Sequence, residues 1–237
     1  MHHPERKNIP DHAWNGVYIK DIVYGANDGI ITTFAVVAGV AGAGLDATVV
    51  LLLGLASLIA DGFSMAASNY LGSKSEKHFT LRERRVEEME FKADPHWEYT
   101  EMEGILKKKG YTSEDIAVLS PLLFKSKDFW IDIMLQEELG VSPVDEGGHP
   151  IKNGAATFSA FVIAGVIPLT PYLFISGTYD TFSTAIIFTA ITLFVVGALR
   201  SRFTGNSWVL EGFEMLFVGG IAAVIAYGIG YVISSIV

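Results

Sequence analysis

Five apolar segments, each about as long as a lipid bilayer is thick, constrain this chain more than any other feature. They cover roughly residues 20–41, 47–71, 153–175, 182–200 and 209–235. A helix needs about 20 mostly apolar residues to cross the hydrocarbon core. Half of the 237 residues are apolar, only 18% are charged, and the mean hydropathy is +0.38, which is too apolar for an ordinary soluble domain. The sequence therefore predicts an all-α membrane protein with five transmembrane helices.

A long polar segment separates the second and third spans. Residues 72–150 carry 17 of the 26 acidic and 11 of the 17 basic residues, and the whole chain has a net charge of −9. The acidity argues against a nucleic-acid partner and fits a cationic ligand. We predict four parts, which are residues 1–19 as an N-terminal segment, 20–71 as spans one and two, 72–152 as an acidic helical domain, and 153–237 as spans three to five.

The positions of the basic residues predict the orientation. Arg200 and Arg202 lie in the short loop between the fourth and fifth spans, and loops rich in Lys and Arg stay in the cytoplasm. Counting spans back from this loop places the N-terminus and the 72–152 domain in the cytoplasm and the C-terminus outside. The polar first 16 residues contain no apolar signal region, so we predict no cleaved signal peptide.

Ionisable residues inside the spans are the first functional signal, because each costs about 2.5–3.5 kcal/mol at mid-depth. Asp21 and Asp28 lie seven residues apart on one face of the first span. Asp61 and Met65 lie one turn apart on the second span, and Glu214 lies in the fifth. Such residues usually face a cavity, a substrate pathway or a partner.

Each of these residues also has a structural interpretation. Asp21 could cap its helix at the interface, Asp61 could hydrogen-bond between helices, and Met65 alone would be a core residue. Glu214 could be structural or belong to a proton path. Asp28 is deeper, and function is favoured there. Carboxylates together with a thioether suit a borderline divalent transition metal, and because a carboxylate also titrates, metal and proton can compete for one aspartate.

The 72–152 domain repeats the same ligand types on three predicted helices. Two glutamates lie three residues apart on the first helix and two on the second, and a methionine and a glutamate lie four apart on the third; these are Glu87, Glu90, Glu98, Glu101, Met134 and Glu138. Residues three or four apart share a helix face. One such pair is usually a solvated charged face, but three in one domain indicate reversible metal capture. The sequence predicts no organic cofactor.

Two further patterns concern architecture. "GANDG" places Gly25 and Gly29 four residues apart, which allows another helix to approach closely. Pro168 and Pro171 fall in the third span and should break or kink that helix.

The motifs "YGANDGIITTFAVVAGVAGAG", "LASLIADGFSMAASNYLGSKSE", "FWIDIMLQEELGV", "VIPLTPYLF" and "FEMLFVGGIAAVIAYGIG" together resemble the vacuolar iron transporter family, which includes the yeast vacuolar iron and manganese carrier and nodulin-like proteins. The resemblance runs from about residue 18 to the end. It implies a five-span fold, a homodimer with a pathway between the subunits, and export of Fe²⁺, or in some members Mn²⁺, from the cytosol in exchange for protons.

The resemblance also assigns roles by motif. Asp28 and Met65 match residues that line the pathway, and Asp21 matches an acidic position near its cytoplasmic mouth. The six glutamate and methionine positions of the 72–152 domain match the family's metal ligands. This chain departs from the family at Ser57 and Asn69, where some members carry glutamates, so the resemblance does not fix ion selectivity or proton stoichiometry.

The sequence thus predicts a Fe²⁺/proton exchanger in a cell membrane or a vacuolar membrane, and not an enzyme. One alternative is an exporter of Mn²⁺ or of a broader set of divalent metals, including Zn²⁺ and Co²⁺. Two alternatives of other classes are a membrane metal sensor that binds without transport, and an intramembrane aspartyl protease with Asp28 and Asp61 as its acid–base pair.

Overall fold

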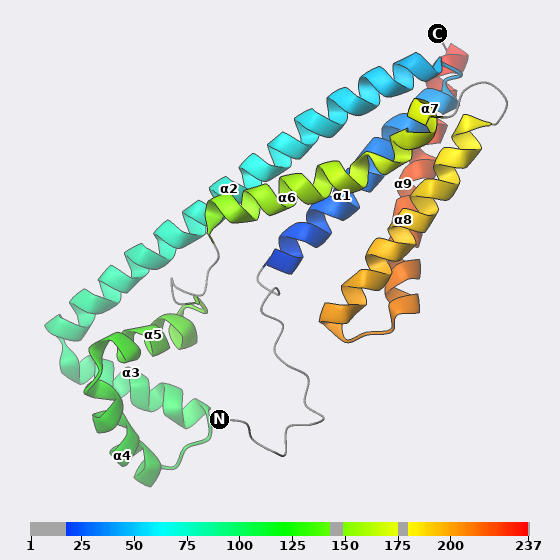
Figure 1. Cartoon of the computed structure of the whole chain (residues 1–237). Coiled ribbons are helices and arrows are strands. Elements are labelled where there is room, and N and C mark those ends of the chain that lie inside the picture. The colour runs from blue at the N-terminus through cyan, green and yellow to red at the C-terminus, as the bar shows by residue number, and fades with distance from the viewer. Residues whose placement is uncertain (1–17, 143–148, 175–179, 237) are drawn as a thin grey trace, which may run out of the picture. The chain divides into compact units, whose positions relative to one another are not determined.

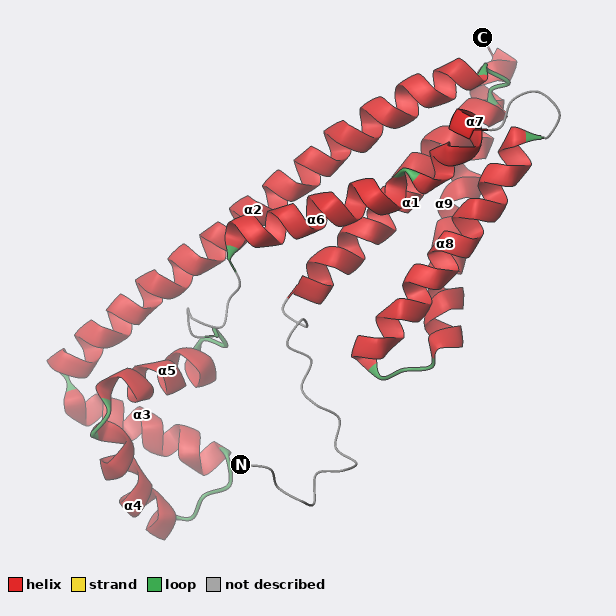
Figure 2. Ribbon diagram, in the orientation of Figure 1, coloured by secondary structure: helices red, strands yellow, loops and turns green. Residues whose placement is uncertain are grey.

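The computed structural model describes residues 18–142, 149–174 and 180–236. Most of the predicted 1–19 segment therefore lies outside the described residues. Within the described part, all regular secondary structure is helical (Figure 2). Five of these helices are long and apolar enough to cross a membrane. The predictions of an all-α protein and of five candidate spans are confirmed.

The chain divides into two compact units, which we describe separately. The membrane unit comprises residues up to Tyr70 and from Ile151 onward, and the acidic unit comprises Leu71–Pro150. The candidate spans are α1 (Ile19–Gly42), α2 (Ala47–Ala93), α6 (Pro150–Gly165) with the segments that follow it, α8 (Thr181–Thr204) and α9 (Trp208–Ile236). Figure 1 shows α2 as one helix of 47 residues that continues from the apolar segment into the acidic one.

The third span is interrupted where the prolines predict. The α6 helix ends at Gly165, a 3₁₀ turn η2 follows over Ile167–Leu169, and a short helix α7 covers Thr170–Phe174. Pro168 and Pro171 lack an amide hydrogen, so an unbroken α-helical ladder cannot pass them. At the break, both the backbone amide and the hydroxyl of Thr170 donate to the carbonyl of Ile167, the hydroxyl at 2.7 Å.

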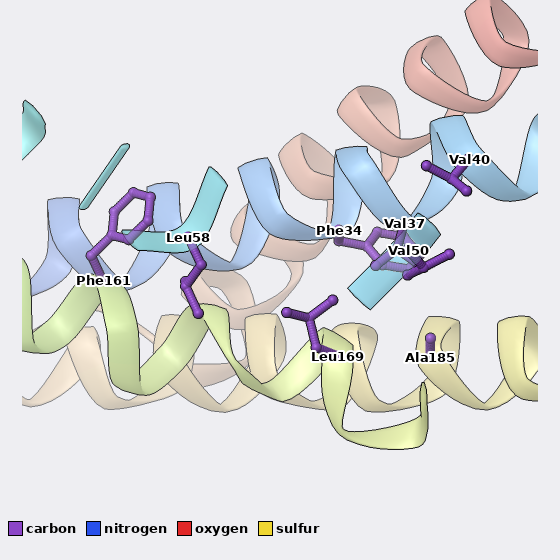
Figure 3. Close-up of a cluster of buried hydrophobic side chains, with 8 residues drawn as sticks. All are labelled: Phe34, Val37, Val40, Val50, Leu58, Phe161, Leu169 and Ala185. Atoms are coloured by element: carbon purple, nitrogen blue, oxygen red, sulfur yellow. The ribbon is translucent and has the colours of Figure 1, made fainter. Parts of the chain in front are cut away.

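The main hydrophobic cluster of the membrane unit combines side chains from several of its helices. Figure 3 shows side chains of α1, α2, α6, η2 and α8 meeting in one cluster; they are Phe34, Val37, Val40, Val50, Leu58, Phe161, Leu169 and Ala185. The Met65 side chain is half-buried and packs against this cluster. Many other apolar side chains of α8 and α9 are exposed, as expected for helices that face lipid.

The predicted close approach at "GANDG" is confirmed. A Cβ atom at Gly29 would overlap the backbone of Phe161 on α6, and one at Gly25 would overlap the carbonyl oxygen of Thr157. On the other helix, a Cβ at Gly165 would lie 2.6 Å from the carbonyl oxygen of Gly29. The α1 and α6 backbones therefore touch, which only glycine permits at these positions.

The acidic unit contains the continuation of α2 followed by α3 (Pro95–Lys108), α4 (Ser113–Phe124) and α5 (Lys127–Glu138). The Asp94 carboxylate caps α3 by accepting from the amides of His96 and Trp97. Thr112 and Asp115 form a reciprocal capping box at the start of α4. These local signals set where α3 and α4 begin.

An aromatic and sulfur-containing core holds the acidic unit together. Its fully buried members include Met102, Trp130 and Met134. Phe91 of α2 and Phe124 of α4 pack on the Trp130 ring with centroid distances of 6.1 and 5.2 Å. Because these residues come from four different helices, the core fixes where the carboxylates of those helices point.

Candidate metal and transport sites

Three predicted metal ligands of the acidic unit meet in space. Glu87 and Glu90 of α2 and Glu98 of α3 each offer a carboxylate oxygen, and these oxygens all lie within 4.8 Å of one another. We call these three residues the carboxylate cluster. An ion with bonds near 2.1 Å separates opposite oxygens by about 4.2 Å, so a small contraction would close the cluster around a transition-metal ion.

Burial distinguishes the members of the carboxylate cluster. Glu87 and Glu98 are 4% and 1% exposed, whereas Glu90 is exposed. A buried carboxylate normally has a positive partner, and no salt bridge involving Glu87 or Glu98 is found among the described residues. Two buried carboxylates beside a third, with an opening at Glu90, form a site suited to a cation that enters from solvent.

The pKa values follow from this crowding of acids. Burial, and then the charges of neighbouring glutamates, raise the pKa of Glu87 from 4.5 to about 7; these neighbours are Glu138, Glu98, Glu90 and Glu101. Burial also raises the pKa of Glu98, although the hydrogen bond from Trp130 opposes the rise. With a pKa of about 7, Glu87 is partly protonated near neutral pH, and an incoming metal ion must displace that proton.

The other three predicted ligands lie around a neighbouring cavity of the acidic unit. Glu101, Met134 and Glu138 line a space of about 350 Å³. Burial, and then the charges of Glu101 and Glu90, raise the pKa of Glu138. The predicted ligands thus form two groups, three at the carboxylate cluster and three at this cavity, and the electrostatic influence of Glu138 and Glu101 on Glu87 shows that the two groups are close.

Trp130 is a site residue that the sequence analysis missed. Its indole nitrogen donates a hydrogen bond of 2.9 Å to a carboxylate oxygen of Glu98, and both side chains are buried. The only sequence signal is spacing, since Trp130, Met134 and Glu138 follow one another every four residues along α5. This face of α5 therefore carries both predicted ligands and a hydrogen-bond donor to a third.

An ion-pair network ties α5 to α2. The Arg84 guanidinium binds the carboxylates of Asp132 and, at 3.2 Å, Asp128. Glu88 of α2, which directly follows Glu87, pairs with Lys127 at 3.6 Å. Basic partners neutralise these acids, in contrast to Glu87, the residue directly before Glu88, for which no salt bridge is found among the described residues.

In the membrane unit, Asp21 is buried and connected to two other helices. The Asn69 side-chain amide of α2 donates to a carboxylate oxygen of Asp21 at 2.8 Å and to the Thr157 hydroxyl of α6 at 2.6 Å. Asn69 thus joins α1, α2 and α6 through one side chain. Asp21 lies in the first turn of α1, whose N-cap residue Tyr18 makes no side-chain capping bond among the described residues, and a capping role for Asp21 stays a prediction.

Asp28 and Asp61 lie near enough for their charges to interact, although they come from different spans. The Asp28 side chain is half-buried, and Asp61 is exposed and accepts a hydrogen bond from the Ser57 hydroxyl. One turn further along α1, the Thr32 hydroxyl donates to the backbone carbonyl of Asp28 at 2.7 Å. The structure thus brings together two predicted carboxylates from neighbouring spans, whereas Met65, one turn from Asp61 on α2, packs against the hydrophobic cluster.

Glu214 lies in a different environment from the other predicted pathway residues. Both Glu214 and the buried Glu211 form ion pairs with Arg200 of α8. Glu211 also accepts from Thr204 at 3.1 Å and from Asn206 at 2.8 Å. The ion pair between Glu214 and Arg200 favours the structural interpretation of Glu214, in which it stabilises the connection between α8 and α9.

Comparison with known proteins gives the family. The sequence profile of the VIT family matches residues 19–231. The chain belongs to the VIT family. It is 33% identical to vacuolar iron transporter 1 of Oryza sativa subsp. japonica over 96% of its own length and 88% of that protein. It is 34% identical to the vacuolar iron transporter of Toxoplasma gondii over 93% and 76%, and 33% identical to that of Plasmodium falciparum over 99% and 89%.

Family membership bears on the alternatives raised above. The match includes both the candidate spans and the acidic unit, so the predicted family is confirmed over nearly the whole chain. The relatives are named as transporters and not as enzymes, which agrees with the prediction that this protein is not an enzyme. The aspartyl protease alternative has no support from these relatives.

Proposed function

We propose that this protein exports Fe²⁺ from the cytosol across a membrane in exchange for protons. The observation that carries the proposal is the match to proteins named as vacuolar iron transporters, over more than nine-tenths of this chain. The placement of carboxylates in both units supports it, because a metal exporter needs ligands where the ion is collected and where it crosses.

Capture begins at the acidic unit, which we place in the cytoplasm. The ion enters past the exposed Glu90, meets the buried Glu87 and Glu98, and displaces the proton that burial and the neighbouring glutamates retain on Glu87. The neighbouring cavity with Glu101, Met134 and Glu138 supplies a second set of ligands. Zn²⁺, Co²⁺ and Mn²⁺ are further candidate substrates, because carboxylate and thioether ligands barely separate these ions.

Passage through the membrane depends on Asp28, Asp61 and Met65. The two carboxylates replace part of the ion's hydration shell, and repulsion between them falls when a divalent cation or a proton arrives. We propose that the metal binds while both are ionised and that protons replace it on the far side. Asp21, held by Asn69 and Thr157, lies near the cytoplasmic mouth in this account, and two copies of the chain form the pathway as a homodimer.

The function is tested with purified protein in liposomes. Fe²⁺ entry into vesicles with an acidic lumen is measured alongside luminal pH, and the same is done with Mn²⁺. Fe²⁺ entry accompanied by a rise in luminal pH supports exchange. Binding of Fe²⁺ without any flux would favour the metal-sensor alternative, and flux that ignores the pH gradient would remove protons from the proposal.

A further inference from the structure

The contact between Trp130 and Glu98 assigns a role to a residue that is neither a ligand nor charged. Glu98 is 1% exposed and Trp130 is 0% exposed. The bond between the indole nitrogen and one Glu98 oxygen is 2.9 Å long, an ordinary length for an N–H···O bond. Burial of both groups means that water cannot replace this donor, so the contact fixes where the Glu98 carboxylate points.

The Trp130 ring is itself held in place. Phe91, Tyr99 and Phe124 surround it at centroid distances of 6.1, 5.5 and 5.2 Å. The backbone amide of Trp130 also bonds to the carbonyl of Ser126 at the start of α5. The donor is therefore rigid, and a rigid donor can select one rotamer of the glutamate that it binds.

The chemistry of a carboxylate explains why this matters for a metal ion. Glu98 has two oxygens, and the indole uses one of them, so the other remains for the ion. The three oxygens of the carboxylate cluster lie within 4.8 Å of one another while Glu98 is held in this way. Donors that orient a metal ligand commonly contribute 10–100-fold to metal affinity.

We propose that Trp130 is a positioning residue for metal capture: its indole N–H holds one oxygen of Glu98 and thereby presents the other to an ion shared with Glu87 and Glu90. This inference rests on the capture step of the proposed function and adds the group that pre-arranges the site. Trp130 touches Glu98 and not the metal, so its effect must pass through Glu98.

The test is a double-mutant cycle on the full chain in detergent, with Mn²⁺ affinity measured by titration calorimetry. Trp130→Phe removes the indole donor, and we expect affinity to fall about tenfold. Glu98→Gln removes the ligand. If Trp130 acts through Glu98, adding Trp130→Phe to Glu98→Gln changes the affinity no further. Equal losses in both backgrounds would mean that Trp130 only supports the fold and would overturn the proposal.

Two controls separate hydrogen bonding from packing. Phe91→Leu loosens the contacts that hold the Trp130 ring but keeps its N–H, so Mn²⁺ affinity should fall by less than it does in Trp130→Phe. Trp97→Phe changes an exposed tryptophan beside Glu98 and should have no effect. If Trp130→Phe does not fold, benzothienylalanine at position 130 keeps the ring shape, lacks only the donor, and should show the same tenfold loss.

The outcomes also distinguish the inference from the function beneath it. A wild-type chain that binds no Mn²⁺ would overturn the capture step and the inference with it. A wild-type chain that binds Mn²⁺, together with a donor-free variant of unchanged affinity, would overturn the role of Trp130 alone.

Discussion

Replacing Glu87 by glutamine should stabilise the metal-free protein at the same time as it weakens metal binding. Glu87 is 4% exposed and surrounded by acids. Its pKa is about 7 in the folded protein and 4.5 as an ordinary glutamate. The folded state therefore binds this proton more tightly than the unfolded state, and the free energy of unfolding falls as pH rises from about 4.5 to 7.

The size of the effect follows from the pKa difference. About 2.5 units at 1.36 kcal/mol per unit sets a ceiling of roughly 3 kcal/mol. Glu90 and Glu138 are exposed, so water screens part of their repulsion with Glu87. We therefore expect the free energy of unfolding of Glu87→Gln to exceed that of the wild type by about 1–2 kcal/mol. Glu87→Gln removes this charge, so its gain should appear at pH 8 and vanish at pH 5, where the wild-type carboxyl is already neutral.

The assay is thermal unfolding of the full chain in detergent with a chelator, followed by tryptophan fluorescence at pH 5 and pH 8. Glu88→Gln is the matched control, because Glu88 is the neighbouring acid and pairs with Lys127 and Arg84. That variant should be neutral or slightly less stable at both pH values. A Glu87→Gln protein no more stable than wild type at pH 8 would refute the claim that Glu87 is a crowded, uncompensated acid.

Three other predictions test separate parts of the account. Mn²⁺ affinity should fall about tenfold from pH 8 to pH 6 in calorimetry, because the ionised fraction of Glu87 drops from about ten-elevenths to one-eleventh around a pKa of about 7; a flat profile would contradict proton displacement. Gly29→Ala should cost about 1–3 kcal/mol by overpacking against α6, whereas Gly220→Ala, with open space at its Cβ, should leave the melting temperature unchanged. Arg200→Met should lower the melting temperature, because buried Glu211 loses its cationic partner. The variant should keep the wild-type Mn²⁺ affinity, and a loss of affinity would show that the α8–α9 loop affects metal capture.

The helices could be predicted because their signals are local. Span length and apolar content gave five candidate spans, and Pro168 and Pro171 marked the break in the third. Pro95 and Thr112 are local signals of a helix start, and α3 and α4 begin at these positions. The glycines of "GANDG" predicted a close helix contact, although nothing in the sequence indicated that α6 would be the partner.

The candidate sites could be predicted only in part, because contacts between residues far apart in the sequence produce no periodic pattern in it. Spacing of three residues placed Glu87 and Glu90 on one face, but not beside Glu98. The hydrogen bond from Trp130 to Glu98 joins residues that are 32 positions apart. In the sequence, Trp130 cannot be distinguished from an ordinary core tryptophan. Glu214 appeared as an unpaired intramembrane acid until the structure paired it with Arg200.

The proposed function depends most on Asp28, a half-buried aspartate that we propose carries metal across the membrane in exchange for protons. The most direct measurement is Fe²⁺ entry into acid-lumen liposomes for wild type and Asp28→Asn, each checked for intact Mn²⁺ binding at the acidic unit. The account predicts gradient-driven entry in wild type and loss of entry in the variant, with binding unchanged. Equal entry in both proteins would contradict it and leave Asp28 with a structural role.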